Sequence, residues 1–263
     1  MSNVAFREYR WLARHLWRDA NPIRRLRALR ASVSDWRRFW SSYDRYVDLL
    51  VANRADRLSV RKSLLRTLFP CVHDATATHD IEPTYFYQDA WAFELIVKAR
   101  PRQHVDIGSH HKFVALLSKV VPVTMVDIRP LSLPLNTLEF RAGSILALPY
   151  PDDSIPSVSS LCVVEHIGLG RYGDPLDPEG TDKALGELKR IVAPGGDLYV
   201  SIPLDDMTRT YFNAHRAFAE DDLLFRFKPF QLVEKRYIFG NEFGESLRSG
   251  FGTGCYHLRK PFP

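Results

Sequence analysis

The stretch from His104 to Asp127 carries the clearest pattern of apolar and polar positions in the chain. A short apolar run, broken only by Asp106, predicts a buried strand that ends in a turn at Gly108. Four apolar residues then recur three and four positions apart, which predicts a helix with one stripe facing a sheet: Phe113, Leu116, Leu117 and Val120. A second apolar run, 123–127, ends on Asp127. This order predicts a parallel βαβ unit whose first turn lies at the carboxyl edge of the sheet.

The same alternation continues on both sides of this unit. Helices are predicted at 84–99, 184–192 and 214–225. Strands are predicted at 138–141, 157–164, 197–203, 230–239 and 254–260. Strands that alternate with helices are typical of an α/β fold with a largely parallel sheet.

The first part of the chain has a different composition. Residues 1–70 carry 16 Lys and Arg against 6 Asp and Glu, whereas the rest carries 20 against 25. Basic helices with many aromatic residues are predicted at 6–19, 23–30 and 35–53, the last one capped by Ser34. Residues 70–83 are polar and lack periodicity. We therefore predict a helical extension with its linker over 1–83 and a second domain over 84–263.

Two interpretations of the extension are retained. Arginine with interfacial aromatic residues on a helix can lie on an anionic membrane surface. The same composition can pack against a neighbouring domain or a second copy of the chain, as in a homo-oligomer. Nucleic acid is not an expected partner, because the basic charge is confined to the extension.

Composition also narrows the cellular setting. No apolar run approaches the roughly 20 residues that span a bilayer, and arginines interrupt any signal-peptide pattern at the N-terminus. Cys71, Cys162 and Cys255 are scattered without metal-ligand spacing, so neither a disulfide framework nor a metal site is expected. The expected location is the cytoplasm, with peripheral contact at the inner face of the membrane as an addition.

Two carboxylates in the central stretch suggest a ligand. Asp127 lies about 20 residues after Gly108, at the end of the second strand, where an acid suits the two hydroxyls of a ribose. Asp106 needs hydrogen-bond donors, because a carboxylate is costly to bury in an apolar strand. Either the amides of its own turn or the ammonium group of a ligand can supply them.

Three stretches resemble motifs of the class I S-adenosylmethionine-dependent methyltransferases. The first, 106–112, keeps the acid and first glycine of D/E-x-G-x-G-x-G, with His110 and Lys112 at the later glycines. The second is 142–154, AGSILALPYPDDS, in which Ser144 replaces the usual acid, and the third is the E-L-x-R-x-x-x-P-G-G pattern that begins at Glu187. The resemblance covers about residues 84–260. It implies a Rossmann-like seven-stranded sheet closed by an antiparallel hairpin, with S-adenosylmethionine as cofactor.

The resemblance also implies roles for single residues. Asp106, Gly108 and Ser109 would contact the methionine part of the cofactor, Asp127 the ribose, and Ser144 with Ile145 the adenine. Ile128 is a further cofactor-binding candidate, and Tyr87 and Gln88 are candidates to cover the cofactor. The alternative for the aromatic residues of helix 84–99 is packing in the core.

The predicted fourth strand is followed by Glu165 and His166, where this family delivers side chains to the substrate. His166 is the candidate general base, since histidine accepts protons near neutral pH; the alternative is a histidine that ties down the loop. Residues 168–180 form a loop with four glycines and two prolines, and its carboxylates, Asp174 among them, are further candidates for the base. Carboxylates, arginine and aromatic rings in this loop suit a sugar.

The run EHIGLGRYGDP, 165–175, resembles more narrowly an uncharacterised methyltransferase-like family of bacteria whose members often accompany surface-polysaccharide biosynthesis. The implied activity is O-methylation of a sugar or glycan, lipid-linked or nucleotide-linked. One alternative is a binding or scaffold protein whose cofactor pocket is filled by His110, His111 and Lys112. Another is a different transferase in which this turn binds a phosphate.

Overall fold

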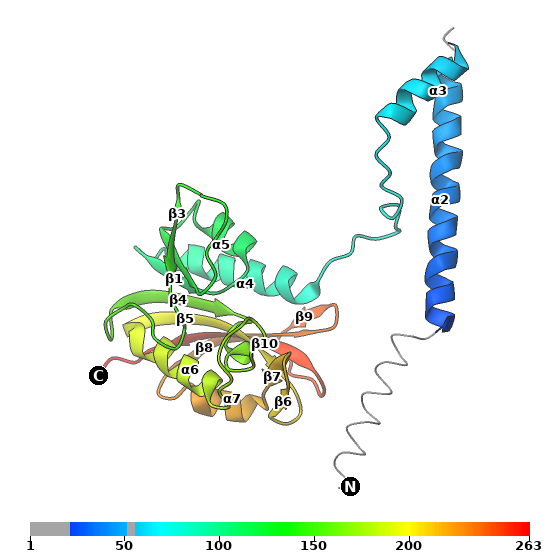
Figure 1. Ribbon diagram of the computed structural model, residues 1–263. Helices are drawn as coiled ribbons and strands as arrows, with labels where there is room; N and C mark the ends of the chain where they lie inside the picture. The colour runs from blue at the N-terminus through cyan, green and yellow to red at the C-terminus, as the bar shows by residue number, and fades with distance from the viewer. Residues whose placement is uncertain (1–21, 52–55) are drawn as a thin grey trace. The chain divides into compact units, whose positions relative to one another are not determined.

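The computed structural model describes residues 22–51 and 56–263, and the chain divides into two compact units, 1–80 and 81–263 (Figure 1). The helix predicted at 6–19 lies outside the described residues. Over the ranges that are described, none of the helices combines the length and the apolar character needed to cross a membrane.

The first unit contains a long helix, α2 (Pro22–Val51), and a short one, α3 (Arg57–Arg66). The predicted break before residue 35, with Ser34 as a cap, is wrong. Neither glycine nor proline occurs between Arg30 and Asp35, so nothing interrupts the helical hydrogen bonds there. Asp56 begins α3 by accepting hydrogen bonds from the amides of Leu58 and Ser59.

An aromatic row runs along α2, and α3 covers part of it. Neighbouring rings of Trp36, Phe39, Trp40 and Tyr43 meet edge to face at 5.2–5.6 Å. The Tyr43 hydroxyl donates to the carbonyl of Arg61 at 2.8 Å. Trp36 and Trp40 each keep 39% of their surface exposed within this unit. Both interpretations of the extension stay predictions.

The second unit is built on one twisted sheet with strand order β3-β2-β1-β4-β5-β10-β8-β9. The strands are β1 (His104–Ile107), β2 (Val123–Asp127), β3 (Leu138–Ala142), β4 (Ile155–Leu161), β5 (Val192–Leu204), β8 (Gln231–Phe239), β9 (Glu242–Gly244) and β10 (Gly252–Arg259). The strands β1 to β5 pair in parallel, and β10, β8 and β9 close the sheet in antiparallel pairing. The expected α/β sheet with its closing hairpin is confirmed. The three-residue β9 extends the expected seven strands to eight.

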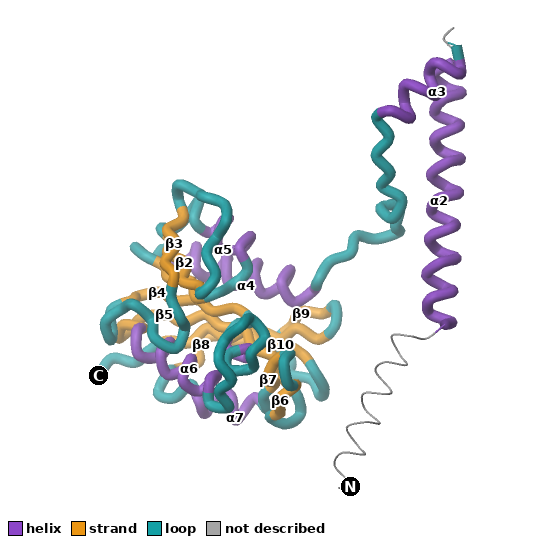
Figure 2. Tube along the Cα trace, viewed as in Figure 1, coloured by secondary structure: helices purple, strands orange, loops and turns teal. Residues whose placement is uncertain are grey.

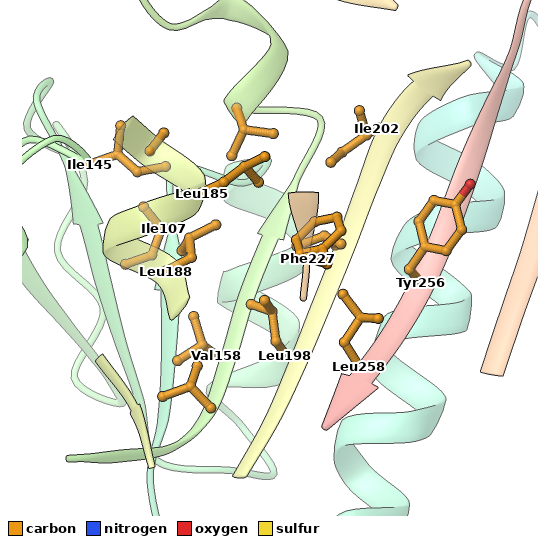
Figure 3. Close-up of a cluster of buried hydrophobic side chains, with 14 of the residues drawn as sticks. Ile107, Ile145, Val158, Leu185, Leu188, Leu198, Ile202, Phe227, Tyr256 and Leu258 are labelled. Atoms are coloured by element: carbon orange, nitrogen blue, oxygen red, sulfur yellow. The ribbon is translucent and has the colours of Figure 1, made fainter. Parts of the chain in front are cut away.

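Helices cover both faces of the sheet (Figure 2). They are α4 (Pro83–Ala99) and α5 (His111–Leu117) on one face, and α6 (Gly180–Ile191) and α7 (Glu220–Arg226) on the other. Along β5, Leu198 and Ile202 point to the α6 and α7 side, as Figure 3 shows, whereas Tyr199 packs among residues of α4 and α5. This alternation buries both faces, as a doubly covered sheet requires.

Two predicted elements differ from the structure. The helix predicted at 214–225 is wrong in its first half, where β7 (His215–Ala217) pairs with the preceding β6 (Arg209–Tyr211) in a small antiparallel hairpin. The predicted stripe of α5 is also wrong in part. Phe113 and Leu117 are buried as expected, but Leu116 and Val120 are exposed and Val114 is buried in their place. The helix ends after seven residues, so its buried face is only two turns long.

Leu117 and its neighbour Leu116 provide a matched test of this packing, because Leu117 is fully buried and Leu116 is 67% exposed. We expect Leu117→Ala to lower the free energy of unfolding by about 2–5 kcal/mol, since it leaves a cavity. Leu116→Ala should stay within about 0.5 kcal/mol of the wild type. Urea unfolding followed by circular dichroism measures both, and equal losses would contradict the observed face.

Candidate functional site

A pocket of about 630 Å³ opens at the carboxyl ends of β1, β2 and β4. Its volume lies within the range of small-molecule sites. The predicted site residues that line it are Gly108, Ser109, Asp127, Ile128, Ser144, Ile145, His166 and Asp174. Asp106, Glu165, Tyr87 and Gln88 are not among its lining residues. The structure therefore brings eight of the predicted residues together from five separate segments.

The turn after β1 depends on Gly108. Its φ of +70° lies in the left-handed region, and a Cβ there would come within 3.1 Å of Val163 Cγ1. The same Cβ would lie 3.9 Å from Asp127 Oδ2. The missing side chain thus lets the turn approach the acid at the end of β2 closely.

Asp106 is fully buried and binds its own turn. Its Oδ1 accepts the Ser109 amide at 3.0 Å, and its Oδ2 accepts the Ser159 hydroxyl at 2.5 Å. Burial raises the pKa of Asp106 to about 6, although both hydrogen bonds act in the opposite direction. The first of the two interpretations, donors from the turn, therefore describes this residue. Ser109 turns its own hydroxyl inward, where it accepts the Leu161 amide at 2.9 Å.

A chain of buried hydrogen bonds continues from Asp106 and joins β1 to β4. Because Ser159 donates to Asp106, it must accept from His104 Nε2, which lies 2.8 Å away. His104 Nδ1 then accepts from the Ser157 hydroxyl, also at 2.8 Å. The imidazole is fully buried and neutral, because burial lowers its pKa to about 3.

Asp127 lies at the end of β2 with one oxygen turned to the chain. Its Oδ1 accepts the Arg129 amide at 2.8 Å, and the side chain keeps 11% of its surface exposed. Oδ2 points toward Gly108 and has no hydrogen-bond partner among the described residues. Ser144 lies after the neighbouring strand β3, where the Gly143 amide donates to the Asp127 carbonyl at 3.1 Å. Its Oγ accepts the Leu146 amide at 3.2 Å, which leaves its hydroxyl proton for a ligand.

Neither Tyr87 nor Gln88 lines the pocket, although the Gln88 Oε1 accepts the thiol of Cys162, a lining residue, at 3.1 Å. The Tyr87 ring stacks on Phe243, with centroids 5.2 Å apart. Gln88 is buried, and its Oε1 accepts the Ser201 hydroxyl at 2.6 Å. Tyr85 lines the pocket instead. Residues 85 and 88 share one side of a helix whereas 87 does not, so helical periodicity could have indicated Tyr85.

The His-His-Lys turn leaves the pocket open. His110 packs against Tyr85 at 5.2 Å and against His111 at 4.2 Å between ring centroids. Lys112 is exposed and is not a lining residue. Of the two side chains at the positions of the missing glycines, His110 therefore borders the cavity without filling it, and Lys112 lies outside its lining.

His166 follows β4 in a 3₁₀ turn, Val164–His166, and its ring is held in one tautomer. Nδ1 donates to the Ala214 carbonyl at 2.6 Å, so Nε2 carries the lone pair. Burial, with a contribution from the Arg171 charge, lowers the pKa of His166 to about 4. The imidazole is therefore neutral at pH 7 and can accept a proton at Nε2.

Glu165 lies beneath His166 and is 1% exposed. Its Oε1 is 3.6 Å from His166 Nε2, and its Oε2 has no hydrogen-bond partner within the described part of the chain. Burial raises the pKa of Glu165 to about 8. Because both groups are neutral at pH 7, the two side chains form a neutral contact and no ion pair.

Asp174 holds the glycine loop in shape. It accepts the amides of Gly168 at 2.7 Å, Tyr172 at 3.2 Å and Gly170 at 3.4 Å. Burial alone would raise the pKa of Asp174, but these amides lower it. Both of its oxygens are engaged by loop amides, so it is a poor candidate for the base. Gly168 is required here, because a Cβ would lie 2.1 Å from the Asp177 carbonyl oxygen.

Two arginines that the sequence patterns did not single out also hold this loop. Arg216 on β7 donates to the carbonyls of Ile167 at 2.6 Å and Asp177 at 3.1 Å. The Arg129 guanidinium lies over the Tyr172 ring at 4.6 Å, which connects the end of β2 to the loop. A single sequence gives no pattern for such pairs, because their partners are distant along the chain.

Comparison with known proteins agrees with this fold. The N-methyltransferase NodS from Bradyrhizobium japonicum, in complex with S-adenosyl-l-homocysteine, is 16% identical with a TM-score of 0.51, over 76% of this chain and 98% of its own. A protein proposed to be a sarcosine dimethylglycine methyltransferase, from Galdieria sulphuraria, is 13% identical with a TM-score of 0.50, over 67% and 85%. The chain thus has the fold of the class I methyltransferases. At these identities the likeness shows the fold alone.

Comparison of the sequence with protein families and curated proteins does not identify a function. A family model described as "Caenorhabditis protein of unknown function, DUF268" matches residues 150–246, which is less than half of the chain. The matched range contains His166 and the glycine loop. No curated protein shows significant similarity to this sequence.

The buried His104 should make stability depend on pH. Its pKa is about 3 in the folded state against about 6.5 when exposed, so between these values only the unfolded chain binds the proton. Stability should fall as the pH drops from 6.5 toward 3, by about 1.4 kcal/mol per pH unit from this group. We expect a shallower slope for His104→Gln in urea unfolding at pH 6, 5 and 4. His111→Gln, at an exposed position, is the matched control, and identical slopes for wild type and His104→Gln would contradict the assignment.

Proposed function

We propose that the protein is an S-adenosylmethionine-dependent O-methyltransferase that acts on a sugar or glycan intermediate of surface-polysaccharide synthesis. One observation carries the proposal. An open pocket of about 630 Å³ has Gly108 and Asp127 side by side in one wall and the neutral His166 in another. A cofactor anchor and a proton acceptor thus border the same cavity.

The residues of the pocket fit this cofactor. Asp127 Oδ2 is available to ribose hydroxyls, and the close turn at Gly108 leaves room for the methionine part. Ile128 and Ile145 offer apolar contacts to the adenine ring, and the Ser144 hydroxyl offers it a hydrogen bond. Asp106 would act indirectly, by fixing the Ser109 amide.

S-adenosylmethionine, when bound, supplies an activated methyl group on a positively charged sulfur. The chain then has to hold an acceptor hydroxyl in line and remove its proton. His166 Nε2 can take this proton, because the Ala214 carbonyl fixes the other ring nitrogen as the donor. Most of the rate would come from holding both reactants in this geometry.

The choice of a glycan rests on less direct support. A hydroxyl acceptor needs a base such as His166, and the glycine loop supplies aromatic, basic and acidic side chains beside it. The resemblance of residues 165–175 to a polysaccharide-associated family points the same way. The basic first unit would suit a lipid-linked or nucleotide-linked acceptor at the cytoplasmic face of the membrane.

Calorimetric titration with S-adenosylmethionine and S-adenosylhomocysteine tests the cofactor site. We expect micromolar binding by the wild type and a loss of about 10- to 100-fold in Asp127→Ala, because hydrogen bonds from the ribose to a charged group are lost. Asp221→Ala, at an exposed carboxylate on α7, is the matched control. If the wild type gives no heat at millimolar ligand, the cofactor assignment is wrong.

Methyl transfer from tritiated cofactor to bacterial polysaccharide tests the base. His166→Gln should lower kcat by about 10²–10⁴-fold with unchanged affinity for S-adenosylhomocysteine. Glu165→Gln mimics the protonated carboxyl, so it should retain activity near pH 7. It should differ from the wild type only above about pH 8, where Glu165 loses its proton. A large loss at pH 7 in Glu165→Gln alone would assign the base to Glu165.

A further inference from the structure

The carboxyl edge of the sheet extends beyond the pocket toward β10. The strands β4 and β5 are parallel, so β5 ends at Leu204 on the edge where the pocket lies. Gly252, the first residue of β10, pairs with Leu204. The β6–β7 hairpin that follows β5 and the loop that precedes β10 therefore lie on the same edge as the pocket (Figure 1).

Three rings from these two segments meet in a cluster that we call the aromatic platform: Tyr211, His215 and Phe251. Ring centroids are 5.1 Å apart for Tyr211 and His215, 5.2 Å for His215 and Phe251, and 6.2 Å for Tyr211 and Phe251. Phe251 is 53% exposed and Tyr211 is 37% exposed. A contiguous cluster of exposed aromatic rings commonly marks a binding site.

The aromatic platform is connected directly to the candidate base. Ala214, the residue before His215, provides the carbonyl that accepts from His166 Nδ1. Arg171 of the glycine loop donates to the same carbonyl at 3.0 Å. One backbone oxygen thus joins the loop, the candidate base and the hairpin that carries the platform.

Two carboxylates hold the platform in place by accepting hydrogen bonds from it and from the residues beside it. Asp205 accepts the Tyr211 hydroxyl at 2.5 Å and pairs with Arg209 at 3.2 Å. Asp206 accepts the Ser249 hydroxyl at 2.9 Å and the Gly250 amide at 2.8 Å, directly before Phe251. The rings are therefore presented on a preorganised support, which reduces the entropy lost on binding.

We propose that the aromatic platform binds the saccharide ring of the acceptor and presents one of its hydroxyls to His166. A pyranose ring has a face of C–H groups that packs on aromatic rings and a rim of hydroxyls that needs polar partners. Tyr211 and Phe251 provide the first, and His215, which contacts both rings, provides a polar group beside them. Further polar groups come from Arg209, which pairs with the Asp205 that binds Tyr211, and from Arg171, which binds the carbonyl of Ala214. A fatty chain would instead need a continuous apolar groove. This inference rests on the proposed methyltransferase function and adds the acceptor subsite to it.

An array of bacterial surface glycans, probed with the full-length labelled protein and S-adenosylhomocysteine, tests the platform. We expect binding to a subset of glycans, reduced about tenfold or more in Phe251→Ala. Phe251→Trp keeps an aromatic ring and should retain binding. Phe225→Ala removes a ring that is even more exposed, 66%, from α7 outside the platform, and serves as the matched control.

The outcomes separate this inference from the proposed function, because cofactor binding is measured by calorimetry on the same variants. If Phe251→Ala binds glycans as the wild type does, or if the wild type binds none, the platform is not a saccharide site. Glycan binding that depends on Phe251, in a protein that does not bind S-adenosylhomocysteine, would support the platform and overturn the methyltransferase function. Loss of cofactor binding in Phe251→Ala would show a general structural effect and count against the platform.

Discussion

The carboxyl group of Asp106, fully buried between two parallel strands, constrains the whole carboxyl edge of the sheet. A buried carboxyl without donors costs several kcal/mol, so one donor must come from the turn after β1 and another from β4. The turn provides the Ser109 amide, and the pairing of Asp106 with Ser159 in the β1–β4 register provides the hydroxyl. A slip of one residue would turn Ser159 to the opposite face of the sheet. The positions of the turn, and with it one wall of the pocket, follow from this requirement.

On the side of the pocket formed by the segment 165–174, burial and hydrogen bonds determine which groups carry charge. Burial keeps the His166 imidazole and the Glu165 carboxyl uncharged near neutral pH, while Asp174 is kept ionised by loop amides. The same type of acid therefore has two roles, set by its surroundings. A neutral base suits a site that would hold a positively charged methyl donor, because two cations would repel each other there.

Local patterns in the sequence predicted the parts of the fold and site that depend on neighbouring residues. The turn at Gly108, the acid at Asp127 and the buried face of α6 all follow from spacing along the chain, and the pocket contains most of the residues that the motif pattern indicated. Interactions between distant residues were not predictable in this way. Asp106 accepts a hydrogen bond from a serine 53 positions away. β7 forms where a helix was predicted, because it pairs with β6 in the hairpin at 209–217. Ser34 was assigned as a cap from its residue type, although nothing in the chain stops α2 there.

Arg216 has a consequence for how ligands at the two sides of the edge would influence each other. It lies on β7, next to His215. It donates hydrogen bonds to the carbonyl of Ile167, directly before the glycine loop, and to that of Asp177, near the end of the loop. The same loop contributes Tyr172 and Asp174 to the pocket wall. A ligand that shifts the hairpin would therefore shift the loop, and a ligand in the pocket would shift the hairpin. Such coupling is reciprocal by thermodynamic necessity, so each ligand would change the affinity for the other by the same factor.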